Sequence, residues 1–139
     1  MTRSMTSLMN TATLEHGSMG RVAYARIAPN EDLIKGVEQL CLAHGFKNAF
    51  VRGALGSLVD CCLARRDDSW QHIKGPAVEI VSLAGEVRLQ ADSSLSATLS
   101  GVVADTQGNI YGGLFVPGHN PICMTFEVTL EEWLPDQVS

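Results

Sequence analysis

Only one stretch of this sequence has apolar residues at helical spacing, so the chain is limited to a mostly β architecture with one short helix. The stripe lies within residues 33–44 and consists of Leu33, Ile34, Val37, Leu40, Cys41 and His44. Asn30 is the predicted N-cap, with Glu31 and Asp32 in the first turn. Gly45 suits the left-handed position that ends a helix. Gly36, in mid-helix, costs about 1 kcal/mol relative to alanine and therefore predicts close packing.

The rest of the sequence consists of short β-prone segments separated by turn signals. We expect turns at Gly56-Ser57 and at residues 66–69, a hairpin loop at residues 105–108, and a bulge at Gly85. Strands are expected at residues 21–27, 48–54, 58–65, 70–73, 78–83, 87–89, 95–104, 109–116 and 122–130. The last segment alternates, with Ile122, Met124, Phe126, Val128 and Leu130 on one face. This pattern predicts an α+β fold with a mainly antiparallel, bent β-sheet and one principal α-helix.

The length of 139 residues is that of one domain, which we expect to span residues 19–135. Residues 1–18 and 136–139 are predicted to be flexible tails. The content of 45% hydrophobic and 18% charged residues is typical of a soluble globular protein. Apolar runs are far shorter than the roughly 18 residues that a membrane span needs. The N-terminal segment lacks the apolar core of a secretion signal, which favours a cytoplasmic protein.

The four cysteines are Cys41, Cys61, Cys62 and Cys123, and none is spaced as Cys-x-x-Cys. We expect them to be small buried apolar residues in a reducing compartment. A disulfide framework or a cysteine zinc site is not predicted.

Four stretches, in order, resemble the PPC (plants and prokaryotes conserved) domain. They are NEDL at residues 30–33, GALGSL at 53–58, VEIVSLAG at 78–85, and GNIYGG at 108–113 followed by FEV at 126–128. Bacteria carry this domain as a stand-alone protein that is often labelled DNA-binding, and plants carry it behind AT-hooks. The resemblance covers roughly residues 20–133. It implies an α+β fold on an antiparallel sheet and assembly as a homotrimer.

The resemblance also implies a metal-binding cluster, which many prokaryotic members build from a His-x-His strand and a histidine directly after Gly-Gly. The matching positions here are Thr98, Ser100 and Leu114, none of which is histidine. Zinc takes imidazole, thiolate or carboxylate ligands and needs about three of them, so we expect no metal and no cofactor. Gly112 and Gly113 are then expected to bring the backbone close to a neighbouring strand or subunit, with Leu114 filling the vacated space.

Hydroxyl side chains form a second candidate group. Ser96, Thr98 and Ser100 share one strand face, where they either line a small-ligand pocket or form an ordinary half-exposed surface. Ser57 has no histidine or lysine at a spacing that would indicate a catalytic base, and the motif Gly-x-Ser-x-Gly of serine hydrolases is absent from the sequence. An enzyme that uses a Ser/Thr-lined pocket is therefore the last of three functional alternatives.

Charged residues within apolar strands form a third group. Arg26 and Arg52 lie in such strands, and Glu79 and Glu127 occupy comparable positions. They either form an Arg–Glu network at a subunit contact or pocket wall, or the arginines point to solvent. The net charge of −5 and the pI near 5.2 disfavour binding to phosphates. A DNA-associated protein is thus the second alternative, and the sequence has no Arg-Gly-Arg-Pro hook.

The leading prediction is a non-enzymatic homotrimeric module that binds a partner protein or a small ligand in a cleft between subunits. Val78, Glu79, Ile80 and Gly85 are the predicted partner surface, because this strand and bulge resemble the stretch through which plant members recruit partners. The candidate cleft residues are Arg26, Arg52, Gly56, Ser57, Thr98, Ser100, Gly112, Gly113, Leu114 and Glu127.

Overall fold

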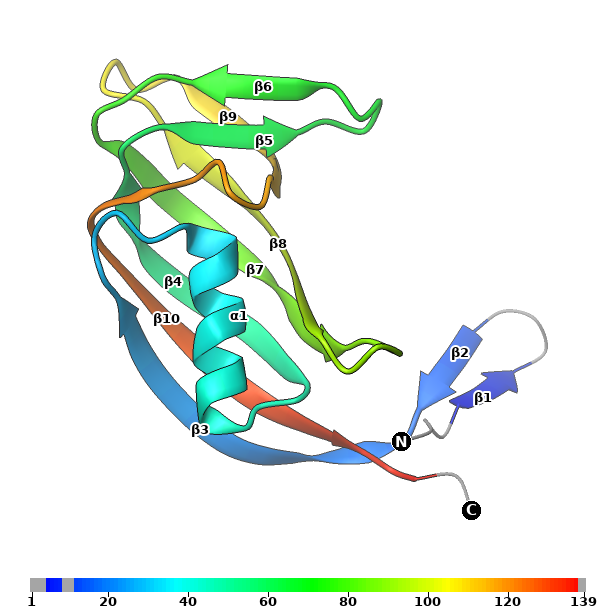
Figure 1. Ribbon diagram of the computed structural model, residues 1–139. Coiled ribbons are helices and arrows are strands. Elements are labelled where there is room, and N and C mark those ends of the chain that lie inside the picture. The colour runs from blue at the N-terminus through cyan, green and yellow to red at the C-terminus, as the bar shows by residue number, and fades with distance from the viewer. Residues whose placement is uncertain (1–4, 9–11, 138–139) are drawn as a thin grey trace.

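The β-prone segments pair into an antiparallel sheet that bends around the helix (Figure 1). The computed structural model describes residues 5–8 and 12–137. Its eight-stranded sheet has the order β3-β10-β4-β7-β8-β9-β5-β6, with every neighbouring pair antiparallel, and β1 pairs with β2 in a separate small sheet. The predicted α+β class is confirmed. The strands are β1 Met5–Leu8, β2 Ala12–Glu15, β3 Gly17–Ile27, β4 Ala49–Leu58, β5 Cys61–Ala64, β6 Trp70–Ile73, β7 Val78–Leu89, β8 Leu95–Ala104, β9 Ile110–Phe115 and β10 Ile122–Pro135.

The helix α1 spans Leu33–His44, and its ends differ in how well they were predicted. Gly45 ends it with a left-handed φ of 73°, as expected. The N-cap is Asp32 and not Asn30, because the Asp32 carboxylate accepts the Lys35 N–H at 3.0 Å. Asn30 instead has a φ of 72° in the preceding turn, and no acidic residue lies in the first helical turn.

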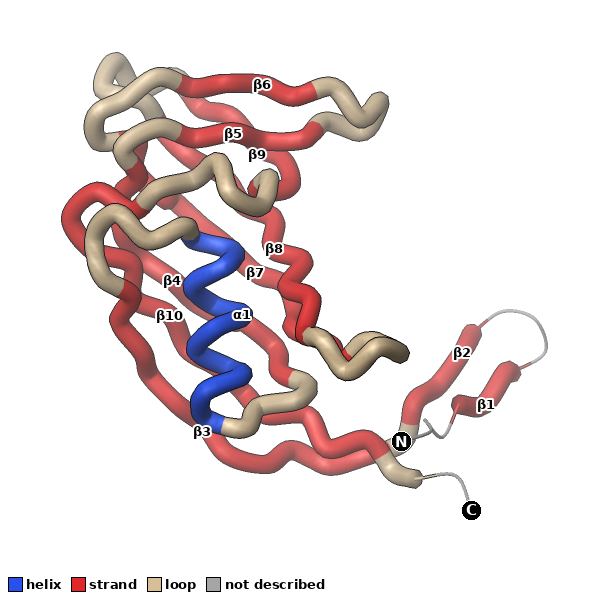
Figure 2. Tube along the Cα trace, viewed as in Figure 1, coloured by secondary structure: helices blue, strands red, loops and turns tan. Residues whose placement is uncertain are grey.

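The core lies between α1 and the inner face of the sheet (Figure 2). Leu33, Ile34, Val37 and Cys41 of the predicted stripe are buried, whereas Leu40 is half-buried and the helix-terminal His44 is exposed. A Cβ placed on Gly36 would lie 2.9 Å from Cγ2 of Ile27, so the predicted close packing at this glycine is confirmed. The largest fully buried side chains of the sheet are Phe126, Leu58, Leu63, Leu99, Ile122 and Leu130.

The turn predicted at Gly56-Ser57 is wrong. Strand β4 continues through both residues, and the chain turns at residues 59–60. Gly56 is needed for a different reason: with a φ of 149°, a Cβ there would lie 2.2 Å from the carbonyl oxygen of Thr125. Close approach of β10 therefore explains this glycine.

The bulge predicted at Gly85 is also misplaced. Strand β7 is continuous, Gly85 lies in regular register opposite Leu99 of β8, and the register shift falls between Ile80 and Ser82. A Cβ on Gly85 would lie 2.1 Å from the carbonyl oxygen of Thr98. Here too, the glycine permits a neighbouring backbone to approach closely.

The alternation predicted for the last strand holds in part. Ile122, Phe126, Val128 and Leu130 are buried, but Met124 is 74% exposed. The pairing of β10 with β4 is irregular between Ile122 and Phe126, which turns Met124 outward. Three of the four cysteines are buried, and the fourth, Cys123, is half-buried.

The predicted N-terminal tail carries strand structure where it is described, because β2 and the first residues of β3 lie before residue 19. Residues 1–4, 9–11 and 138–139 of the predicted tails lie outside the described residues. Within the described part of the chain, no helix is long and apolar enough to cross a membrane.

Candidate functional site

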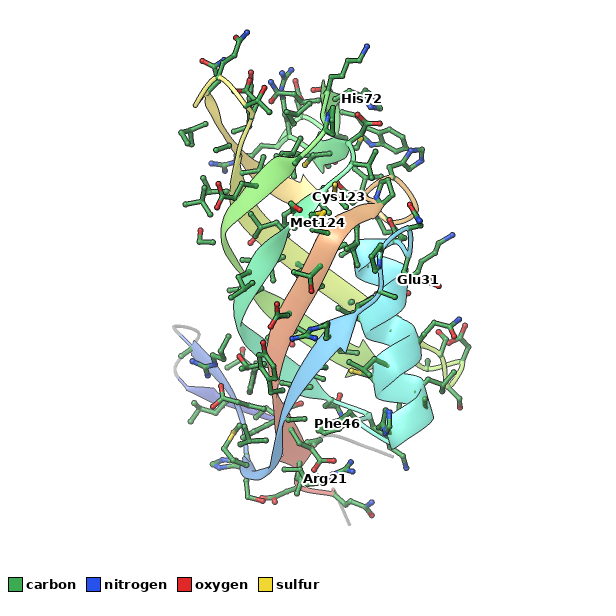
Figure 3. The ribbon with its side chains drawn as sticks, turned by 90° about the vertical axis from the view of Figure 1, so that its left-hand side faces the viewer. Arg21, Glu31, Phe46, His72, Cys123 and Met124 are labelled. Atoms are coloured by element: carbon green, nitrogen blue, oxygen red, sulfur yellow. The ribbon has the colours of Figure 1, made fainter. Side chains whose placement is uncertain are left out.

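Most of the predicted site residues alternate with buried residues along their strands and therefore lie on the outer face of the sheet, the face opposite α1. Figure 3 views the molecule from the side where β3, β10 and β4 turn their outer face to the viewer, with Met124 labelled on β10. Strands β8 and β9 show the alternation clearly. Ala97 and Leu99 of β8 point into the core, while Thr98 and Ser100 are exposed on the other side. The predicted row of hydroxyl side chains therefore exists and faces outward.

The register brings together two of the three positions that the resemblance matches to metal ligands. Ser100 of β8 lies directly opposite Leu114 of β9, and Thr98 lies opposite Glu86 of β7. Beside them, β7, β8 and β9 form a shallow depression of about 420 Å³ on the outer face. Its lining residues are Ser82, Leu83, Ala84, Ser100, Gly101, Val102, Gly112 and Gly113. The depression offers hydroxyl groups and small apolar surfaces to a ligand.

The two adjacent glycines have separate explanations. A Cβ on Gly113 would lie 2.8 Å from the carbonyl oxygen of Ala64, so the close approach of β5 requires this glycine. A Cβ on Gly112 would lie 3.6 Å from its nearest neighbour, an ordinary contact that would only make the depression shallower. Leu114 is 45% exposed, so within one chain its side chain faces outward and does not fill an enclosed space.

Arg26 pairs with Glu127 across β3 and β10, as the Arg–Glu alternative proposed. The Arg26 Nη2 lies 3.5 Å from Glu127 Oε1, and the Tyr24 hydroxyl donates a hydrogen bond to the same carboxylate oxygen. The hydrogen bond from Tyr24 and the charge of Arg26 hold the pKa of Glu127 below its usual value. Conversely, the same hydrogen bond raises the pKa of Tyr24. The carboxylate of Glu127 is thus already engaged by two neighbouring side chains.

Arg52 has a different partner from the one expected. Its Nε lies 2.9 Å from Glu131 Oε2, and its guanidinium carbon lies 5.3 Å from the centre of the Phe50 ring. Glu79 is exposed on β7 and takes no part in either pair. Arg26 and Arg52 therefore belong to two separate ion pairs on the outer face, and not to one network of four.

The predicted partner surface on β7 is largely interior. Val78 is fully buried and Ile80 is 5% exposed, so both pack in the core. Gly85 lies against β8, and of the four predicted residues only Glu79 is exposed. Val81, at the register shift, is 56% exposed. A partner at this strand can contact Glu79 and Val81 but not the buried side chains.

Ser57 is half-buried, and its hydroxyl oxygen accepts the Met124 N–H at 3.3 Å. Among the described residues, no acid, base or second nucleophile is hydrogen-bonded to this hydroxyl. Ser57 thus holds the start of β10 against the end of β4.

An arginine that the sequence did not single out joins three elements. Arg21 of β3 pairs with Glu132 of β10 at 2.9 Å, and its guanidinium donates to the carbonyl oxygens of His44 and Gly45, each at 3.1 Å. It also lies 4.2 Å above the Phe46 ring. These hydrogen bonds satisfy the end of α1, and the hydrogen bond from Arg21 holds the pKa of Glu132 below its usual value.

The comparison with known families is consistent with this architecture. The sequence model of the Plants and Prokaryotes Conserved (PCC) domain, also abbreviated PPC, matches residues 14–134. The chain belongs to this family. The resemblance predicted from the four sequence stretches is thereby confirmed.

Solved structures share the fold of this PCC domain at low sequence identity. The plant- and prokaryote-conserved protein of Pyrococcus horikoshii has a TM-score of 0.74 and 21% identity, covering 88% of this chain and 85% of that one. A metal-containing protein from Archaeoglobus fulgidus has a TM-score of 0.73 and 18% identity, covering 87% and 85%. A candidate DNA-binding protein from Ralstonia eutropha JMP134 has a TM-score of 0.66 and 13% identity, covering 81% and 78%.

One curated relative is much longer than this chain. The bifunctional protein GlmU of Synechococcus sp. (strain JA-2-3B'a(2-13)) is 32% identical over 93 residues. These residues are 67% of this chain but only 14% of that protein. The chain therefore spans a small fraction of the length of this relative.

The donor atoms at Thr98, Ser100 and Leu114, the positions that the resemblance matches to metal ligands, do not fit a metal ion. Thr98 and Ser100 offer neutral hydroxyls, and Leu114 offers no donor atom. Among residues 5–8 and 12–137, no group of three or more His, Cys, Asp or Glu side chains is placed to hold a metal ion.

Proposed function

We propose that this PCC domain is a non-enzymatic, metal-free module that assembles as a homotrimer and binds a partner protein or a small ligand in a cleft between subunits. The observation that carries the proposal is the composition of the outer sheet face. Ser100 and Leu114 lie opposite each other there, beside the depression at Gly112, and all three are exposed in a single chain. Exposed apolar surface beside hydroxyl groups is typical of a surface that binds.

The cleft would be formed by the outward-facing residues of the predicted set: Arg26, Arg52, Ser57, Thr98, Ser100, Gly112, Leu114 and Glu127. Gly56 and Gly113 act as spacers behind this surface, because neighbouring backbone leaves no room for a side chain at either position. Free, buried thiols are compatible with the reducing cytoplasm, where we place the protein.

Light scattering coupled to size-exclusion chromatography tests the assembly, with an expected mass of three times the 14.9 kDa of one chain. Native mass spectrometry of the same sample tests the cleft, because a bound small molecule adds a defined mass to the trimer. Metal analysis is expected to find less than one equivalent of zinc per trimer. A monomer in solution, or stoichiometric zinc, would contradict the proposal.

The second candidate function is DNA binding, which the description of the Ralstonia eutropha relative favours. The net charge of −5 opposes it, because non-specific affinity for DNA comes from neutralising phosphates. An electrophoretic mobility-shift assay at about 50 mM salt, where such contacts are strongest, separates the two functions. We expect no shift, and a shift that weakens as salt is added would favour DNA binding.

A further inference from the structure

The eight-stranded sheet ends in two edge strands, β3 and β6, which differ in how well they are protected. Strand β6 has only four residues, and shortness is one way in which proteins keep an edge from pairing with other chains. Strand β3 has eleven residues, contains no proline and pairs with β10 on one side. Among the described residues, no other backbone is hydrogen-bonded to its second side. An edge of this kind presents a row of backbone N–H and C=O groups to an incoming strand.

A groove runs along this free edge, between β3 and α1. It consists of two neighbouring hollows of about 370 and about 620 Å³, and both are lined by Leu40. Consecutive residues 21–28 form one wall, so the exposed backbone edge itself lines the groove. Gly36, Gln39, Leu40 and Ala43 of α1 form the other wall. We call it the β3–α1 groove.

Small side chains on β3 explain why the groove is open. Ala23 and Ala25 are half-buried on the face toward α1, whereas Val22 and Tyr24 alternate with them and are exposed. The methyl groups of two alanines leave the space between β3 and Leu40 unfilled. Larger apolar side chains placed there would cover Leu40, which is half-buried, and would remove apolar surface from water.

The arginines of the groove are already engaged within the chain. At one end, Arg21 bridges β3 to the last carbonyl oxygens of α1 and pairs with Glu132. Further along, Arg26 pairs with Glu127. In Figure 3, α1 lies beside β3, with Arg21 labelled near one end of the groove. Residues 22–25, between the two arginines, are uncharged. An uncharged segment suits this stretch, because a charge laid against it would lose water without gaining a partner.

We propose that β3 binds an extended, uncharged peptide segment of a partner protein as an added strand, whose alternate side chains fill the β3–α1 groove. The backbone row calls for an extended backbone, and the space beside Ala23 and Ala25 calls for β-branched apolar side chains at every second position. A second copy of β3 fits poorly, because its own inward residues include the same two alanines. This inference goes beyond the function proposed above, since the groove is formed within one chain and needs no trimer.

A synthetic peptide tests the added strand. The probe is a hexapeptide of alternating valine and threonine with acetyl and amide ends, N-methylated at every valine. N-methylation blocks one edge of the peptide, which keeps it from building sheets with itself while the other edge remains able to pair. The control peptide has lysine in place of each valine. The probe is expected to bind and the control is not, because lysine would bring charges to the uncharged stretch of the groove.

Amide hydrogen exchange, followed by NMR, shows whether the probe pairs with the backbone. In the free protein, every second amide of residues 22–27 is expected to exchange rapidly, because it points away from β10. Probe at ten times its dissociation constant is expected to slow these amides by about ten-fold and to leave the interleaved amides unchanged. The amides of β6, at the other edge of the sheet, are expected to keep their rates. A ligand held only by its side chains would not produce this alternation.

Arginine substitutions at neighbouring residues of α1 test the groove. Ala43→Arg places a long charged side chain in the β3–α1 groove. Leu42→Arg is the matched control, because Leu42 lies on the other flank of the helix, beside Leu95. Both positions are exposed and arginine is a good helix former, so both variants are expected to fold, which circular dichroism checks. Ala43→Arg is expected to weaken probe binding by about ten-fold or more, and Leu42→Arg by less than about two-fold.

Three results would overturn this inference. They are slow exchange of all amides of residues 22–27 before probe is added, unchanged exchange at saturating probe, and equal binding by the two arginine variants. Each of them leaves the proposed function standing, because that function is tested by the mass of the protein in solution and by its metal content. A monomer in solution that still binds the probe would instead contradict the proposed function and support the added strand.

Discussion

Replacing Asn120 by alanine is expected to lower the free energy of unfolding by about 3 kcal/mol. Asn120 is fully buried, and its side-chain amide joins β5 to the loop before β10. Its Oδ1 accepts the Cys62 N–H at 2.8 Å, and its Nδ2 donates to the carbonyl oxygens of Cys62 and Val116 at 3.1 and 2.9 Å.

The magnitude follows from what alanine leaves behind. The Cys62 N–H loses its acceptor, and a buried donor without a partner costs about 1–3 kcal/mol. The two carbonyl oxygens keep other donors, the Val116 N–H at 3.0 Å and the His119 N–H at 3.2 Å. Each of these carbonyl oxygens therefore loses only one of its hydrogen bonds, at a cost of about 0.5–1.5 kcal/mol.

Urea unfolding followed by tryptophan fluorescence measures this effect, at one fixed protein concentration because assembly adds to stability. Asn109→Ala is the control, because Asn109 also bonds a neighbour, Asp105, through its side chain, at 3.0 Å, but is exposed. The control is expected to lose less than about 1 kcal/mol. Equal losses in the two variants would refute the assignment of the cost to burial.

Asn120→Asp sharpens the same prediction through pH. The aspartate keeps an acceptor for the Cys62 N–H. Its second carboxylate oxygen, however, replaces the amide N–H₂ donor and faces the carbonyl oxygens of Cys62 and Val116. Burial and these oxygens raise the carboxyl pKa in the folded state above its unfolded value. The destabilisation is therefore expected to be smaller at pH 4, where the protonated carboxyl donates a hydrogen bond, than at pH 7. A loss that does not change with pH would contradict this account.

Three further predictions concern other parts of the fold. Gly113→Ala is expected to cost about 1–3 kcal/mol by thermal unfolding because it pushes β5 away from β9, whereas Gly112→Ala, with ordinary contacts at its Cβ, is expected to change stability little. Arg21 lowers the pKa of Glu132 in the folded state, so the pair stabilises the fold above the unfolded pKa near 4.5. This stabilisation is lost as the pH falls through the folded pKa of Glu132. The melting temperature of Glu132→Gln is therefore expected to change less between pH 7 and pH 3 than that of the wild type. A water-soluble thiol reagent is expected to modify only Cys123 in the native protein, because the other three thiols are buried. Burial also raises the pKa of Cys41 to about 11 and that of Cys61 to about 12. Labelling of a buried thiol faster than Cys123 would count against this packing.

The helix and most strands could be predicted from sequence because their signals are local. Apolar spacing and Gly45 are sufficient to define α1, and alternation is sufficient to define β8. Glycine within a strand was the main source of error. Gly56 and Gly85 both lie where a neighbouring backbone leaves no room for a Cβ, and nothing local distinguishes this from a turn or a bulge. Only the register between strands that are distant in sequence shows whether such a glycine marks a turn, a bulge or a close approach of backbone.

The candidate site shows the same division between local and distant information. That Thr98 and Ser100 face outward follows from alternation alone. The partner of Arg52 cannot be predicted from alternation, because it depends on the register of β10 against β4. That register places Glu131 beside Arg52, whereas Glu79 is not paired with it. The buried residues of the expected partner surface, Val78 among them, have the apolar character of a core strand, which sequence cannot separate from an exposed apolar stripe.

The pairing of charges on the outer face bears on both candidate functions at once. Arg26, Arg52 and Arg88 each have a carboxylate within 3.5 Å, the last through Glu86 at 3.0 Å and a second acid on β2. A phosphate would have to displace these acids, so the arginines contribute little to the release of counterions on which DNA affinity depends. The same pairing lowers the cost of covering these three arginines with protein, because each already has a carboxylate partner. The electrostatic feature that weakens the case for DNA therefore supports contact between copies of the chain.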